Sequence, residues 1–96
     1  MSTRYLTLYW FARPEDEPGE PRLGLAVPKA AGGAVVRNRI KRQLREVWRA
    51  KLGSEEIDPS RDYVLVVRPG LPEMAEVRGH VWLAERVDEV LGKAAA

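Results

Sequence analysis

The chain has 96 residues, of which 45% are apolar and 31% are charged, as in an ordinary globular domain. This length predicts one domain spanning 1–96, because it leaves no room for a second core. Its lack of cysteine excludes a disulfide framework, a thiolate zinc site and a cysteine nucleophile. No apolar stretch approaches the roughly 18 residues needed to span a bilayer, and we expect a cytoplasmic protein with no membrane partner.

The formal net charge of +2 conceals an uneven distribution. Residues 22–51 hold nine lysines and arginines against one acid, Glu46, which gives a net charge of +8. The rest of the chain holds seven bases and thirteen acids, a net charge of −6. Such a dipolar molecule has a cationic side that attracts a polyanion. The alternative is that these charges only form a helix face exposed to solvent. Such a face typically carries charges of alternating sign, and in this segment the signs barely alternate.

The first half of the chain predicts two strands. Residues 5–11 alternate between two sets of side chains, which is typical of a strand. The stretch 13–21 is rich in proline, glycine and acids, and we interpret it as a hairpin connection to a second strand over 22–27. On the first strand, Leu6, Leu8 and Trp10 point one way, and Tyr5, Thr7, Tyr9 and Phe11 point the other way.

The second half predicts two helices and a third strand. After small residues over 30–33, apolar residues at helical spacing predict a helix over 34–52, with Gly53 as its stop. The apolar run over 63–67 is typical of a strand covered on both faces. A further stripe predicts one continuous helix over 72–91, built on Met74, Val77, Val81, Ala84, Val87 and Leu91. The order β-β-α-β-α predicts an α+β fold with helices packed on one small sheet.

The predicted helix over 34–52 carries most of the positive charge. At about 100° per residue, its apolar stripe consists of Val36, Ile40, Leu44 and Val47. The other sides present Asn38, Arg42, Arg45 and Arg49 opposite the stripe, Arg37, Lys41 and Trp48 on one flank, and Arg39 and Glu46 on the other. Only the pairing of Glu46 with Arg42 and with Arg49 relieves this charge, by about 0.2–0.5 kcal/mol each.

The start of this helix also favours an anionic partner. No Ser, Thr, Asp or Asn precedes it as a cap. Arg37 and Arg39 lie near the positive end of the helix dipole, where cations are disfavoured by roughly 0.3–1 kcal/mol each. A bound phosphate would reverse both penalties, because open backbone N–H groups attract anions. These residues predict a nucleic acid as the partner.

Aromatic residues on the first strand favour a single-stranded nucleic acid. Tyr5, Tyr9 and Phe11 suit the stacking of unpaired bases better than duplex reading. The alternative is that these rings pack in the core. For Tyr9, the sequence favours neither base stacking nor core packing. A helix-turn-helix reader would need a second helix just upstream of residues 34–52, where the sequence predicts a strand.

A longer motif resembles a known family. Residues 22–29 (RLGLAVPK), then Gly32 and residues 34–42 (AVVRNRIKR), resemble the signature of the bacterial ribonuclease P protein component. Residues 62–64 and the run to Arg68 resemble the family's next strand, so the resemblance covers nearly the whole chain. An Arg-Asn-Arg sequence on a helix, at this distance from a glycine and from a strand that ends in lysine, is highly specific for this family.

The resemblance implies the protein subunit of a ribonucleoprotein endonuclease, a hydrolase that removes the 5′ leader from precursor tRNA. In this family the chemistry belongs to the catalytic RNA, which binds most of the magnesium ions. We therefore expect no catalytic residue in the protein and no cofactor bound by the protein alone. The implied partners are the catalytic RNA, in a 1:1 complex with a protein monomer, and precursor tRNA. The implied fold resembles the second domain of ribosomal protein S5, with a left-handed β-α-β crossover against the right-handed rule.

The charge pattern and the resemblance together define the candidate site residues. The expected RNA-binding residues are Lys29, Arg37, Asn38, Arg39, Lys41, Arg42, Arg45 and Arg49. The resemblance implies that the single-stranded leader lies in a cleft between helix and sheet, lined by Tyr5, Tyr9, Phe11 and Arg68.

Three departures from the family's pattern concern the leader. Family members usually carry a basic N-terminal helix with a cleft aromatic before the first strand, whereas this sequence begins at that strand. Ala30 stands where a second lysine is usual, and Gly33 where a polar residue is common. We therefore expect weak leader binding with retained affinity for the catalytic RNA.

Two other functions fit parts of the sequence. An autonomous enzyme would need catalytic groups, but His80 lies beside an apolar stripe and is expected to be packed or half-buried. The carboxylates within 15–17 and 55–58 are expected to be solvated, which also argues against catalytic groups. Trp82 lies between two arginines in the sequence and is expected to stack on one of these cations. A generic RNA-binding or ribosomal module of the same fold would use the basic helix without the complete motif.

Overall fold

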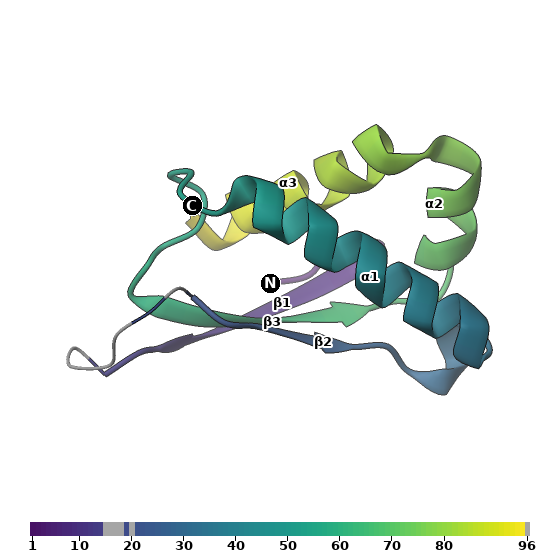
Figure 1. The fold of residues 1–96 in the computed structure, drawn as a ribbon, viewed down its shortest axis with the longest axis horizontal. Helices are drawn as coiled ribbons and strands as arrows, with labels where there is room; N and C mark the ends of the chain where they lie inside the picture. The colour runs from purple at the N-terminus through teal and green to yellow at the C-terminus, as the bar shows by residue number, and fades with distance from the viewer. Residues whose placement is uncertain (15–18, 20, 96) are drawn as a thin grey trace.

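The computed structural model describes residues 1–14, 19 and 21–95. Three strands form one sheet, and the α-helices lie on the same side of it (Figure 1), which confirms the predicted α+β class. No helix in these ranges is long and apolar enough to cross a membrane. The elements are β1 (Leu6–Ala12), β2 (Leu23–Ala26), the 3-10 turn η1 (Lys29–Ala31), α1 (Ala34–Lys51), β3 (Arg61–Val67), α2 (Leu71–Arg78) and α3 (His80–Ala95).

The strand order is β1-β3-β2, with β3 antiparallel to β1 and parallel to β2. The predicted hairpin between the first two strands is therefore wrong, because β3 arrives from later in the chain and lies between them. The connection continues to follow β3 beyond β1, since the backbone N–H of Arg13 donates to the carbonyl of Ser60 at 2.8 Å. Residues 15–18 and 20, including the acids of 15–17, lie outside the described residues.

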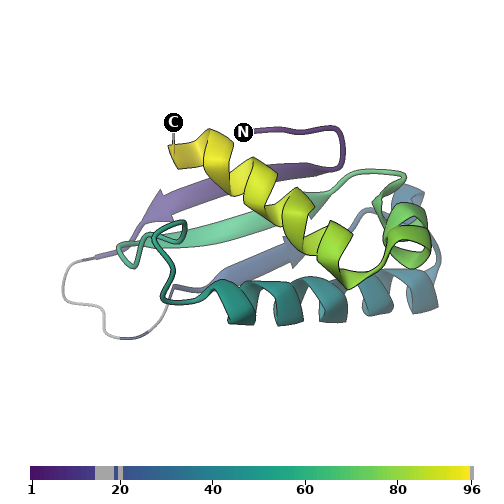
Figure 2. The same ribbon diagram turned by 90° about the horizontal axis from the view of Figure 1, so that it is seen from above.

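The connection from β2 through α1 to β3 is left-handed. In Figure 2, seen from the helix side, α1 lies in front of the sheet and runs back against the direction of the two parallel strands. With those strands pointing up, β3 lies to the left of β2, whereas the usual crossover would place it to the right. The left-handed crossover that the family resemblance implies is confirmed.

The core fills the space between the sheet and the helices. Every second residue of β1 and β3 points to the helices, as the pleat of a strand requires. Each large apolar side chain buried there contributes about 1.5–3 kcal/mol relative to exposure. The largest fully buried side chains are Leu6, Leu8, Ile40, Leu44, Val47, Leu65, Val67, Leu71, Leu83, Val87, Val90 and Leu91.

The central strand β3 is buried on one face only. Tyr63, Leu65 and Val67 face the helices and are buried, whereas Val64 and Val66 are half-buried on the outer face. The prediction of a strand covered on both faces is wrong, because α1, α2 and α3 share one side of the sheet (Figure 2). The valines on the outer face are explained by the preference of β-branched residues for strands.

The last predicted helix is two helices, α2 and α3, which meet at Gly79. The φ of Gly79 is +89°, a conformation that residues with a Cβ rarely adopt, and the chain turns there. The prediction that Val77 and Val81 belong to the apolar stripe of one helix is wrong, because they flank this turn and are 79% and 73% exposed. Farther along α3 it is confirmed, since Val87 and Leu91 are buried.

Residues 1–3 run back along the outer edge of β1. The backbone N–H of Thr3 donates to the carbonyl of Leu6 at 2.8 Å, and that of Leu8 donates to the carbonyl of Met1 at 2.7 Å. Lys93 of α3 donates to the carbonyl of Ser2 at 3.2 Å. These contacts satisfy backbone groups that an open edge would leave exposed.

Candidate nucleic-acid interface

The helix α1 presents a cationic surface, which we call the basic face. The residues of this face are Arg37, Asn38, Arg39, Lys41, Arg42, Arg45 and Arg49, all of them exposed or half-buried. They are held outward because Ile40, Leu44 and Val47 anchor the opposite side of α1 in the core. The predicted stripe is therefore confirmed at these three positions, while Val36 is only half-buried. Trp48, expected on a flank, is buried against Tyr63, with ring centroids 5.1 Å apart.

Most cations of the basic face have no acidic partner among the described residues. Arg39 is the exception, with an ion pair to Glu76 of α2 at 3.5 Å. The predicted pairs of Glu46 with Arg42 and Arg49 are not formed within this part of the chain. Exposed pairs of this kind contribute only about 0–1 kcal/mol, too little to fix long side chains. The positive charge is therefore left to attract an external anion.

The α1 helix begins without a side-chain cap, as predicted. Its N-cap residue is Gly33, and no acid lies in the first turn. At Gly32 the φ is +147°, and an added Cβ would lie 2.8 Å from a methyl carbon of Val36. Only glycine lets the chain enter the helix at this distance. The first backbone N–H groups of α1 have no side-chain acceptor and are available to an anion.

Lys29 lies at the same end of the molecule as the helix start. It is an exposed residue of η1, which lies between the end of β2 and the start of α1. In the motif over residues 22–42, Lys29 comes after the strand and before the helix, and the structure has the same order. Lys29 and the uncapped turn therefore add to the positive potential at this end of the basic face.

Two aromatic side chains lie on the outer face of the sheet. Tyr9 and Phe11 are 52% and 59% exposed, so core packing is excluded for Tyr9. In the register of the sheet Tyr9 lies opposite Val64, whose partner on the other side is Gly24. The surface beside Tyr9 therefore carries no side chain from β2 that would hinder a flat ligand.

Tyr5 does not share this outer face, contrary to the sequence prediction. The chain bends ahead of β1, and the ring of Tyr5 packs edge-to-face on Trp82 of α3, with centroids 5.2 Å apart. Arg68 lies beside Tyr5, because its backbone N–H donates to the carbonyl of Tyr5 at 3.0 Å. Its guanidinium donates to the carbonyl of Thr3 at 2.6 Å. The four predicted leader residues thus form two groups, one just before β1 and at the end of β3, the other along β1. The expected lining of a cleft between helix and sheet is not formed by Tyr9 and Phe11, because both lie on the face of the sheet away from the helices.

Some residues with functional chemistry lie where the sequence did not place them. Trp10, predicted to point the same way as Leu6 and Leu8, is 43% exposed, and the guanidinium carbon of Arg61 lies 3.8 Å from its ring centroid. His80 is exposed at the start of α3, so the expectation of a packed histidine is wrong. Trp82 is half-buried, and its predicted cation stack is confirmed by Arg86 at 5.1 Å. The described residues contain no group of three or more His, Cys, Asp or Glu that could hold a metal ion.

Carboxylates gather at the far end of α1, away from Lys29. Lys51 pairs with Asp88 of α3. A hydrogen bond with Asp88 is the largest cause that raises the pKa of Glu56, followed by partial burial and repulsion from Asp88. Burial acts to raise the pKa of Asp88, but hydrogen bonds from Lys51 and Glu56 and attraction to Lys51 together hold it below its usual range. Glu55 and Glu56 are exposed as expected, while Asp58 is half-buried and accepts hydrogen bonds from Ser60.

These features define an α+β domain with a cationic helix on one side of the sheet and exposed aromatic rings on the other. The family model described as Ribonuclease P matches residues 1–93. The ribonuclease P protein component of Geobacillus sp. (strain WCH70) is 42% identical over 76 residues, which are 77% of this chain and 60% of that protein. That of Acidothermus cellulolyticus is 38% identical over 93 residues, which are 97% of this chain and 72% of that protein.

The solved structures agree with the sequence comparisons. The RNase P protein from Thermotoga maritima superimposes with a TM-score of 0.79 at 26% identity, covering 97% of this chain and 80% of that one. The chain therefore belongs to the ribonuclease P protein family. It spans 60% of the length of the Geobacillus relative and 48% of the Mycobacterium avium relative.

Proposed function

We propose that this chain is the protein subunit of a bacterial ribonuclease P, which binds the catalytic RNA and assists removal of the 5′ leader from precursor tRNA. The observation that carries the proposal is the basic face of α1, in a chain of this family. The cations of this face and of η1 that have no acidic partner among the described residues are Lys29, Arg37, Lys41, Arg42, Arg45 and Arg49.

RNA fits this surface for electrostatic reasons. Each phosphate neutralised by a lysine or arginine releases condensed counterions, which favours binding at low salt. The uncapped start of α1 adds backbone N–H donors for a phosphate beside Arg37 and Lys29. We assign this surface to the catalytic RNA, and we place the particle, one protein to one RNA, in the bacterial cytoplasm, where tRNA matures.

The 5′ leader is assigned to the outer face of the sheet. Tyr9 and Phe11 offer exposed rings on which unpaired bases stack, at roughly 1–3 kcal/mol per base. Tyr5 lies at the bend before β1 and not on the outer face beside Tyr9. It is also packed on Trp82, so we assign no base to Tyr5 or to Arg68.

The chemical step is assigned to the catalytic RNA and the magnesium ions that it binds. The described residues of the protein do not fit a metal, because no three His, Cys, Asp or Glu side chains gather. The protein contributes positive charge and a surface for the leader.

Identifying the RNA that the protein binds tests this proposal. The tagged chain is expressed in a bacterium, and the RNA that copurifies with it is sequenced. The proposal expects one dominant structured RNA, the ribonuclease P RNA, with precursor tRNA enriched beside it. Ribosomal RNA as the main species would instead indicate a generic RNA-binding module and would contradict the proposal.

A further inference from the structure

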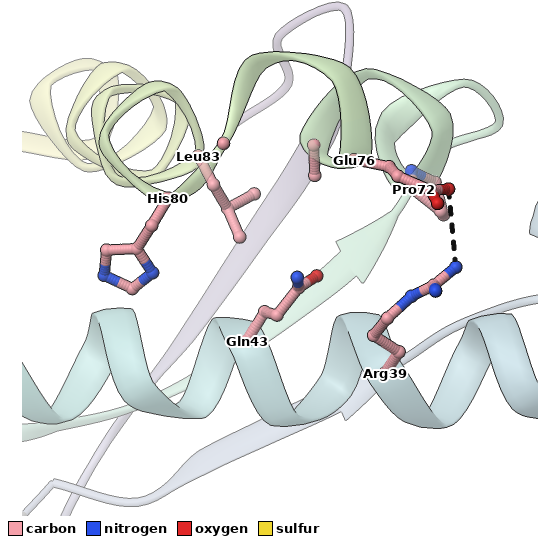
Figure 3. Close-up of a pocket in the computed structure, with 8 residues that line it drawn as sticks. Arg39, Gln43, Pro72, Glu76, His80 and Leu83 are labelled. Carbon is pink, nitrogen blue, oxygen red and sulfur yellow. Dashed lines mark ion pairs between the residues drawn. The ribbon is translucent and has the colours of Figure 1, made fainter.

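A cavity of about 230 Å³ lies between α1 and the corner where α2 meets α3. In Figure 3, Arg39 and Gln43 point up from α1, and His80 points down from the start of α3. The cavity is smaller than the clefts of roughly 300–1,000 Å³ that hold drug-sized ligands, so it suits one flat group. Its lining residues are Arg39, Gln43, Pro72, Ala75, Glu76, Gly79, His80 and Leu83.

The walls of this cavity combine apolar surface with hydrogen-bonding groups. Pro72, Ala75 and Leu83 supply apolar surface from α2 and α3. The Gln43 amide both donates and accepts, and the His80 ring can stack as well as hydrogen-bond. Neither side chain has a hydrogen-bond partner among the described residues. A ligand with a flat ring and both donors and acceptors on its edge would meet all of these groups.

The local charge favours a neutral group over a phosphate. Arg39 is the cation that lines the cavity, and its ion pair with Glu76 at 3.5 Å offsets its charge. Glu76 would repel a phosphate inside the cavity. The unpaired cations Arg42 and Arg45 are exposed on the adjoining basic face, outside the cavity. A sugar–phosphate backbone is therefore favoured on the basic face, while a neutral base is favoured inside.

The cavity adjoins the basic face at Arg39. A second hollow is lined by Val35, Asn38, Arg39 and Arg42, so Arg39 belongs to both. Phosphates that lie along this second hollow would bring their attached bases next to the cavity entrance. Unpaired RNA bases are commonly recognised by stacking and by hydrogen bonds to their edges.

We infer that the cavity between α1 and the α2–α3 corner accepts one unpaired nucleobase of the RNA that lies on the basic face. The inference rests on the proposed function for the identity of that RNA. Gln43 would hydrogen-bond the base edge, His80 would stack on or hydrogen-bond the base, and the Arg39–Glu76 pair would offer a donor beside an acceptor. Gln43 shares the flank of Arg39 at a spacing of four residues, but Glu76 and His80 join them only through tertiary packing.

Mononucleotides test the cavity without any catalytic RNA. Nitrogen-15-labelled protein is titrated separately with AMP, GMP, CMP, UMP and inorganic phosphate, and NMR shifts are followed. At least one nucleotide is expected to shift the Gln43 side-chain amide, the Gly79 amide and the His80 ring, with little effect of inorganic phosphate at these groups. Equal shifts with phosphate, or shifts confined to the basic face, would overturn the inference.

Two variants test the same cavity in the RNA complex. Gln43→Ala and His80→Ala should each weaken binding to a bacterial ribonuclease P RNA by about three- to tenfold, the value of one lost hydrogen bond. Ser54→Ala, an exposed polar truncation beyond the end of α1, should bind as the parent does. Circular dichroism checks that each variant is folded, and parental affinity in both variants would overturn the inference.

The two experiments separate the inference from the proposed function. If the parent protein fails to bind ribonuclease P RNA, the proposed function fails, and the nucleotide shifts alone decide whether the cavity accepts a base. If the parent binds that RNA and neither variant loses affinity, the function stands and the cavity assignment is wrong.

Discussion

At the scale of single residues, Gly32 controls how the chain enters α1. Its φ is +147°, and a Cβ added there would lie only 2.8 Å from Val36, so Gly32→Ala should lower the free energy of unfolding by about 1–3 kcal/mol. Urea unfolding measures this change. Gly33→Ala is the matched control, because its φ is −72° and no atom lies within 4 Å of an added Cβ. A Gly32 variant as stable as the Gly33 variant would refute the assigned role.

Asp88 and Glu56 should give opposite pH dependences. The pKa of Asp88 is lowered in the folded state, so its contribution is present at neutral pH and is lost as the pH falls through that pKa. The pKa of Glu56 is raised, so folding favours its protonated form, and its charge opposes folding at neutral pH. Asp88→Asn should therefore lower the Tm at pH 7, and Glu56→Gln should leave it unchanged or raise it.

Thermal unfolding between pH 3 and pH 7, a window set by the ordinary carboxyl pKa values, checks both variants. The difference between Asp88→Asn and the parent should shrink toward acid pH, as Asp88 of the parent also loses its charge. Glu56→Gln should gain relative to the parent as the pH rises. A constant offset for Asp88→Asn across the range would show that packing, and not the pairing with Lys51, causes its effect.

At the scale of elements, the basic face of α1 should matter more for binding than for folding. Replacing Arg37 and Arg39 with alanine removes two cations near the positive end of the helix dipole. It also removes an exposed ion pair of small value, so the free energy of unfolding should change by less than about 1 kcal/mol. RNA binding should weaken. If both arginines contact phosphate, the logarithm of the association constant should also depend less steeply on the logarithm of the salt concentration, with a slope smaller in magnitude by about 1.4–1.8.

The matched control for this variant removes two cations elsewhere. Arg78→Ala with Lys93→Ala lowers the net charge equally, from the ends of α2 and α3. This control should lose less affinity and keep its salt slope. A loss equal in both double variants would show that RNA responds to total charge and not to the basic face.

The outer face of the sheet should distinguish precursor from mature tRNA. Tyr9→Ala should reduce the preference of the reconstituted particle for precursor tRNA by about 5- to 150-fold, the equivalent of one lost base stack. Tyr9→Phe keeps the ring and should retain most of this preference. Binding assays with both tRNA forms measure the ratio of precursor affinity to mature tRNA affinity. An undiminished ratio in Tyr9→Ala would show that the leader does not bind to this face.

The local pattern of the sequence predicts most elements but not how they pair. The alternation over 5–11 and the apolar stripe of α1 identify a strand and a helix, because each period is set by the chain's own geometry. The position of β3 between β1 and β2 depends on contacts between distant residues, so proximity along the chain wrongly favoured a hairpin. The apolar pattern does not reveal the turn at Gly79, because the exposed Val77 and Val81 continue the helical spacing across it.

The candidate site divides in the same way. The cations of the basic face follow from helical geometry, and the structure places them together as expected. The position of Tyr5 does not follow from the alternation, because the chain bends before β1 and the ring of Tyr5 packs on Trp82. The cavity of Gln43, Glu76 and His80 joins three helices, and no single periodic pattern in the sequence contains it.

At the scale of the whole molecule, charge is separated along the fold. The basic face and Lys29 give one surface an excess of cations, while Glu56 and Asp88 lie beyond the other end of α1. A polyanion should therefore approach in one orientation, with steering that weakens as salt increases. Protein cations that neutralise RNA phosphates also reduce the number of magnesium ions needed to hold two RNAs together.

Cleavage of precursor tRNA across a magnesium titration tests whether this chain acts as the protein subunit of ribonuclease P. A bacterial ribonuclease P RNA is assayed with and without this protein, and the protein is also assayed alone. We predict that the protein restores cleavage at a magnesium concentration where the RNA alone is inactive, and that it cleaves nothing by itself. An unchanged magnesium requirement, or cleavage by the protein without RNA, would contradict the account.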